Sequence, residues 1–179
     1  MEDSALKAPP LLPDETLHRV LRVANFNGLS VLALSGMLTL AIASTGDYHG
    51  AAFALLIAAS GAIELHGAGL LRAGDVRGSR WLIASQPYLL VVMVGYCAIR
   101  LVNYDPALLR GAMTQEMKAT LTQAGYEEER FLRMMYVTTY AVLAIGTIVY
   151  QGLLTAYYVR RRHAISAALD APAGAERFN

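Results

Sequence analysis

The sequence predicts an all-α integral membrane protein, a four-transmembrane-helix bundle with an additional extracytoplasmic amphipathic helix between the third and fourth spans. The first observation is composition, since the 179 residues are 55% hydrophobic and only 16% charged. The second is a mean hydropathy of +0.39, which is higher than a water-soluble domain of this size needs. The third is a set of four apolar stretches, each long enough to cross a hydrocarbon core with about 20 residues. We therefore expect one membrane domain over residues 1–179.

The first span is predicted at residues 23–45, after a cytoplasmic N-terminal arm at residues 1–22. The arm lacks the basic start, short apolar core and small-residue cleavage site of a secretory signal. Asp14 is a candidate N-cap for a short helix that lies on the membrane surface before the span begins. Along the span, small and hydrogen-bonding side chains recur near one face, which favours close packing against a neighbouring helix. These residues are Asn25, Gly28, Ser35 and Thr39.

The second and third spans are predicted at residues 51–71 and 81–102. The sequence GDYHG forms the turn before the second span, and a short basic turn at residues 72–80 follows it. Turns of this length make consecutive helices antiparallel neighbours. Pro87 removes a backbone donor inside the third span, so a kink is expected there.

Residues 103–130 form the one long connection. Asp105 and Pro106 favour a helix start, apolar residues recur about every four positions, and Gly125 ends the pattern. This periodicity predicts the additional amphipathic helix, which we expect to lie in the headgroup region.

The fourth span is predicted at residues 131–159, and it is longer than a bilayer requires. The basic run RRRH at residues 160–163 is expected to stop the span, which leaves residues 160–179 as a cytoplasmic tail. Basic residues cluster on one side of the predicted spans, and short basic loops stay in the cytoplasm. We therefore expect both termini inside a bacterial-type inner membrane, with residues 103–130 outside. The basic residues are Lys7, Arg19, Arg22, Arg72, Arg77, Arg80, Arg160, Arg161 and Arg162.

Glu64 is the most informative residue of the second span. It lies eight residues before the basic turn, or roughly 12 Å into the bilayer at ~1.5 Å per residue. An ionised carboxylate facing lipid costs about 2.5–3.5 kcal/mol or more, so Glu64 should face protein or water. Ser60 shares its face, together with small residues. One interpretation is an ion or proton site on a pathway, and the other is a buried carboxyl or salt-bridge partner that fixes helix register.

His66 does not share this face, since two residues correspond to about 200° around a helix. It stays a candidate pathway residue, although hydrogen bonding to a neighbouring helix is its simpler role. A metal or haem site would need ligands from other helices, and the remaining histidines lie at or beyond the membrane boundaries. They are His18, His49 and His163. We expect no metal and no cofactor.

Arg100 and Arg133 lie near the outer ends of the third and fourth spans. Both can extend to the headgroups, and the alternative is a pair that attracts anions to an outer vestibule. Tyrosines also recur along one face of the fourth span, where packing and an aromatic box for a cation are both compatible with the pattern. They are Tyr136, Tyr140, Tyr150 and Tyr157. Tyr157 and Tyr158 fit the inner aromatic belt.

Several classes of function are disfavoured. A net charge of +1 and the lack of a basic cluster interleaved with aromatics argue against nucleic acid as a partner. Cys97 is the single cysteine, so no intramolecular disulfide can form. Nucleophile motifs, phosphate loops and paired catalytic carboxylates are missing from the sequence, which argues against an enzyme.

Three functions remain, and the lipid bilayer is a partner in each. The leading hypothesis is a homo-oligomeric channel or transporter for an ion or small solute, with Glu64 on a pathway between protomers. The alternative is a non-catalytic accessory or assembly subunit that packs against another membrane protein. The third is a membrane metal or haem redox protein that uses His66. A pathway needs Glu64 at a hydrated surface, an accessory subunit seals it between helices, and a redox protein needs converging ligands.

Overall fold

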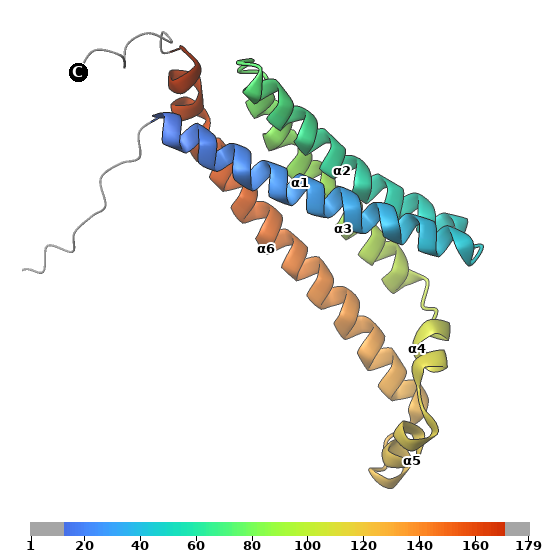
Figure 1. The fold of residues 1–179 in the computed structure, drawn as a ribbon. Helices are drawn as coiled ribbons and strands as arrows, with labels where there is room; N and C mark the ends of the chain where they lie inside the picture. The colour runs from blue at the N-terminus through green and yellow to red at the C-terminus, as the bar shows by residue number, and fades with distance from the viewer. Residues whose placement is uncertain (1–12, 171–179) are drawn as a thin grey trace, which may run out of the picture. The chain divides into compact units, whose positions relative to one another are not determined.

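The computed structural model describes residues 13–170, and this part of the chain is helical without any strand (Figure 1). Four of its helices are long and apolar enough to cross a membrane, which confirms the all-α class and the four candidate spans. These four helices are α1 (Pro13–Ser44), α2 (Tyr48–Arg72), α3 (Gly78–Val102) and α6 (Glu128–Asp170). Two short helices, α4 (Ala107–Ala112) and α5 (Gln115–Gln123), lie between α3 and α6 in the chain.

The described helices divide into two compact units. Residues 13–87 and 154–170 form the first unit, and residues 88–153 form the second. The first unit therefore contains α1, α2, the first part of α3 and the last part of α6. The second contains the rest of α3, then α4, α5 and the first part of α6.

The first unit is built on the antiparallel pair α1 and α2, which run side by side (Figure 1). Glycines bring the backbones together, because a Cβ atom on Gly61 would lie 2.6 Å from the carbonyl oxygen of Gly28. Gly67 and Gly78 make a similar contact between α2 and α3. Apolar side chains from all four helices fill the space between them. This core comprises Val20, Ala24, Ala68, Leu71, Leu82, Leu154, Tyr158 and Ile165.

Helix α2 begins at Tyr48, a few residues before the predicted start of the second span. The Asp47 carboxylate accepts a hydrogen bond from the backbone N–H of Gly50, which caps the first turn. In the turn after α2, the Arg77 side chain donates hydrogen bonds to both carboxylate oxygens of Asp75. These bonds favour the ionised carboxylate and hold the pKa of Asp75 below its usual value.

Helices α1 and α6 both extend beyond the predicted spans. α1 begins at Pro13 and continues unbroken into the first span, so there is no separate surface helix and Asp14 lies in its first turn. α6 continues through the basic run to Asp170. Arginine is a good helix former, so a basic run ends the apolar stretch without ending the helix. The rest of the predicted arm and tail, residues 1–12 and 171–179, lies outside the described residues.

In the second unit, the connection predicted as one amphipathic helix consists of two helices. Met113 is extended, with ψ 119°, and separates α4 from α5. The Thr114 hydroxyl then accepts a hydrogen bond from the backbone N–H of Met117, which starts a new helix. Gly125 has φ 72°, a left-handed conformation that ends α5 close to the predicted position.

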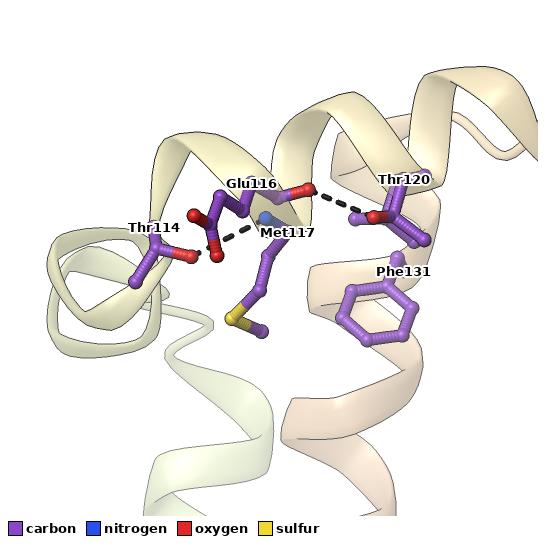
Figure 2. A pocket seen from close by; sticks show the side chains of 6 residues that line it. Thr114, Glu116, Met117, Thr120 and Phe131 are labelled. Carbon is purple, nitrogen blue, oxygen red and sulfur yellow. Dashed lines mark hydrogen bonds between the residues drawn. The ribbon is translucent and has the colours of Figure 1, made fainter.

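Helix α5 rests beside the start of α6 with a pocket of about 380 Å³ between them. Figure 2 shows Met117 and Phe131 pointing into the space between these two helices. No residue of α5 is buried. Two ion pairs join the connection to α6: Lys118 of α5 pairs with Glu128, and Arg110 of α4 pairs with Glu129.

Candidate functional site

The candidate site is the carboxylate of Glu64, in the centre of the first unit. Glu64 is only 2% exposed. The buried face of α2 carries Ser60, Gly61, Glu64, Gly67 and Ala68, which recur at the three- and four-residue spacing of one helix face. Apart from Glu64 itself, these residues are all small, so the other helices can approach the carboxylate closely.

Polar side chains from three other helices lie around Glu64. The Asn27 amide on α1 donates to Oε2 at 2.6 Å, and the Tyr158 hydroxyl on α6 donates to Oε1 at 2.5 Å. Gln86 on α3 is a third polar neighbour of the carboxylate. Each carboxylate oxygen therefore has a donor, as a buried charged or polar group requires. The site joins α1, α2, α3 and α6 through one side chain.

The backbone contacts explain why these donors reach Glu64. Asn27 precedes Gly28, and Gly28 makes the close contact with Gly61, one helical turn before Glu64. One turn after Glu64, Gly67 contacts Gly78 of α3. The two crossings flank the carboxylate, so the small residues around it are the reason that the polar network can form.

Gln86 is itself held by a short chain of hydrogen bonds. Its Nε2 donates to the Ser85 hydroxyl at 2.9 Å, and Ser85 donates to the backbone oxygen of Leu82 at 2.9 Å. Both side chains are 1% exposed. The predicted alternative of a salt-bridge partner does not describe this site, because among residues 13–170 no ion pair includes Glu64. Neutral donors surround the carboxylate instead.

The other two predicted pathway residues, Ser60 and His66, make their polar or aromatic contacts with groups other than the Glu64 carboxylate. Ser60 is buried beside it, but its hydroxyl donates to the backbone oxygen of Ile57 at 2.8 Å in its own helix. His66 is exposed, and its ring packs edge-on against Trp81 of α3, with 5.4 Å between ring centroids. The described residues contain no group of three or more His, Cys, Asp or Glu side chains that could hold a metal ion.

The predicted outer arginines have different neighbours in the second unit. Arg100 donates through Nε to the Tyr140 hydroxyl at 3.1 Å. Arg133 instead lies over the ring of Tyr104, 5.9 Å from its centroid. They are therefore engaged separately, each with its own tyrosine.

The predicted tyrosine face divides into separate clusters. Tyr136 and Tyr140 pack together in the second unit, with ring centroids 4.7 Å apart. Tyr150 is 53% exposed. Tyr157 belongs to the first unit, where the guanidinium of Arg161 lies 4.2 Å from its ring centroid. The face therefore does not form one continuous aromatic box within the described residues.

Three network members carried a signal that sequence reasoning did not use. Asn27 is an amide in a charge-free span, and Gln86 adjoins Pro87 in another. Tyr158 was expected at the aromatic belt, but its residue is 1% exposed and its hydroxyl bonds Glu64. Each had a polar group in an apolar stretch, and such groups need a partner.

Comparisons of the chain with protein-family models, with curated proteins and with solved structures find no match.

Proposed function

We propose that the protein is a non-catalytic accessory or assembly subunit that packs against another membrane protein. One observation carries this proposal: Glu64 is sealed by Asn27 and Tyr158, which use both of its oxygens. A carboxylate held in this way fixes the register of the helices that meet at it. The rigid helix group then presents constant outer surfaces to a neighbour.

The same geometry gives less support to a homo-oligomeric channel or transporter. A pathway residue must exchange ions or protons with water, and the Glu64 residue is 2% exposed. His66 lies on the exposed side of α2 and contacts Trp81 instead of the carboxylate. A redox protein has the least support, because the described residues contain no group of three or more His, Cys, Asp or Glu side chains that could hold a metal ion.

We also propose that α1, α2, α3 and α6 cross an inner membrane as one membrane domain. The basic turn between α2 and α3 and the basic run in α6 would then lie in the cytoplasm, with both termini. The α4–α5 connection would lie outside, with α5 at the headgroups. Its many exposed residues and its lack of buried ones support a place at an interface.

Cysteine labelling tests this topology. On a Cys97→Ala background, we expect Gln123→Cys in α5 to react with a membrane-impermeant maleimide in intact cells. Val76→Cys, in the turn after α2, should react only after the membrane is opened. Both residues are exposed in the structure, so accessibility within the protein does not explain a difference. Labelling in the opposite order would contradict the proposed orientation.

Photocrosslinking in native membranes tests the accessory role. A photoreactive residue replaces an exposed apolar residue, Leu34 of α1 or Val142 of α6. We expect a discrete adduct with a second, different membrane protein, identified by mass spectrometry and reproduced when that protein carries the crosslinker. The matched control replaces Leu82, which is buried in the core and should give no adduct between chains.

Two results would contradict the accessory proposal. Adducts only at multiples of the chain mass would indicate self-association, as the channel hypothesis requires. Flux through proteoliposomes of the purified chain, lost on Glu64→Gln substitution while the fold is retained, would make the carboxylate part of a pathway. We expect no flux from either protein.

A further inference from the structure

A second polar site lies in the second unit, where α3 ends and α4 begins. It is a pocket of about 130 Å³ beside α6. The pocket is bounded by residues from the end of α3, the following connection, α4 and α6. Its lining residues are Arg100, Asp105, Leu109, Tyr136, Thr139 and Tyr140. A cation, a carboxylate and two aromatic rings thus line a space of small-molecule size.

The arginine is held in place by the tyrosines. Its Nε donates to the Tyr140 hydroxyl at 3.1 Å, and its guanidinium carbon lies 5.9 Å from the centroid of the same ring. The Tyr136 hydroxyl donates to the backbone oxygen of Arg100 at 2.9 Å, which ties the last turn of α3 to α6. A guanidinium has five N–H donors, and Nε uses one of them here. The terminal nitrogens of Arg100 make no hydrogen bond to any described residue.

The second charged group of the pocket, the Asp105 carboxylate, is held by a backbone hydrogen bond and not by an ion pair with Arg100. Asp105 Oδ1 accepts a hydrogen bond from the backbone N–H of Ala107, at 3.1 Å, at the start of α4. Among residues 13–170, no ion pair within 4.0 Å joins Asp105 to Arg100. Two opposite charges therefore line one pocket and remain available to a ligand.

We propose that this pocket binds a small zwitterion of the phosphoethanolamine type, with its phosphate on Arg100 and its ammonium on Asp105. A lone anion would bring a like charge toward Asp105, and a lone cation would do the same to Arg100, so a ligand with both charges fits best. Planar guanidinium donors suit phosphate oxygens, and a carboxylate suits an ammonium group.

The chemistry is shared by a free solute and by a phospholipid headgroup. Arg100 lies two residues before the end of α3, so in the proposed membrane orientation the pocket opens at headgroup depth. This placement rests on the membrane topology proposed above, but not on the accessory role. A binding measurement on the purified chain needs no partner protein, so it can succeed where the accessory proposal fails.

Binding to the full chain in detergent micelles tests the proposal. Calorimetry with free phosphoethanolamine and native mass spectrometry with phosphatidylethanolamine are the two arms. We expect Arg100→Gln to lower the affinity for whichever of the two compounds binds by about tenfold or more, because a charge-assisted hydrogen bond is lost. Asp105→Asn should lower phosphoethanolamine affinity by a similar factor and leave inorganic phosphate affinity unchanged or higher.

Two further variants separate binding from folding. Arg133→Gln is the matched control, because this arginine lies over Tyr104 and does not line the pocket. Its affinity should equal that of the wild type. Thr139→Leu places a larger side chain in the pocket without removing either charge. This variant should abolish binding.

The outcomes are distinct. Retention of the lipid with no binding of the free solute identifies a headgroup site, and binding of both with competition identifies a site for the shared chemistry. Equal losses in Arg100→Gln and Arg133→Gln would overturn the proposal, since general surface charge would then explain them. So would phosphate binding as tight as phosphoethanolamine binding, or no binding in either arm.

Discussion

Replacing Glu64 with alanine should lower the free energy of unfolding by about 2–5 kcal/mol. The change removes the hydrogen bonds that Asn27 and Tyr158 donate to Glu64, and each lost buried hydrogen bond costs about 1–3 kcal/mol. Loss of packed side-chain volume in the core adds to this. Equilibrium unfolding in detergent micelles, followed by circular dichroism, measures the change.

Matched variants show whether the carboxylate network is responsible. Glu64→Gln keeps the shape and one acceptor oxygen, so it should lose only about 1 kcal/mol. Glu15→Ala removes a carboxylate from the exposed first turn of α1 and should change stability by less than about 0.5 kcal/mol. Tyr158→Phe should cost less in the Glu64→Ala protein than in the wild type, because its hydrogen bond to Glu64 is already gone. Equal stability of Glu64→Ala and Glu15→Ala would contradict a structural role.

Adding one methyl group at Gly61 should destabilise the first unit by about 1–3 kcal/mol. The new Cβ atom would lie 2.6 Å from the Gly28 carbonyl oxygen and 2.7 Å from the Leu32 nitrogen. Both are backbone atoms, so α1 and α2 must separate to accept it. The separation would also lengthen the hydrogen bond between Asn27 and Glu64. The same unfolding measurement on Gly61→Ala tests this expectation.

Gly69→Ala is the control for the effect of alanine itself. It lies on the same helix, and apart from the adjacent residues and backbone of that helix no atom lies within 4 Å of its added Cβ. Alanine favours a helix over glycine by about 1 kcal/mol, so this variant should be as stable as the wild type or slightly more stable. If both variants behaved alike, backbone approach at Gly61 would not contribute to stability.

The four long helices could be predicted because apolar length is a property of the sequence itself. Their ends were harder to predict, because a basic run such as Arg160 to Arg162 changes hydropathy without breaking backbone hydrogen bonds. The break at Met113 was also missed, since the apolar spacing of residues 109–124 continues across it. Only the local cap at Thr114 marks the second helix, and a lone threonine is a weak signal.

The burial of Glu64 followed from the cost of a carboxylate in lipid, but its partners did not. Partner choice depends on how each helix is rotated and where the helices cross, and a single sequence does not contain that information directly. Tyr158 illustrates the point, because its distance along the sequence from Glu64 gives no hint of contact. The pocket of Arg100 and Asp105 likewise depends on the turn between α3 and α4.

The two hydrogen bonds to Glu64 differ in how much of the chain must exist before they form. Asn27 and Glu64 are 37 residues apart and belong to one helical hairpin, whereas Tyr158 and Glu64 are 94 residues apart. During synthesis from the N-terminus, the hairpin can form while one carboxylate oxygen still lacks its donor. The first unit can therefore assemble in two stages. Its completion needs a segment that is synthesised after the whole second unit.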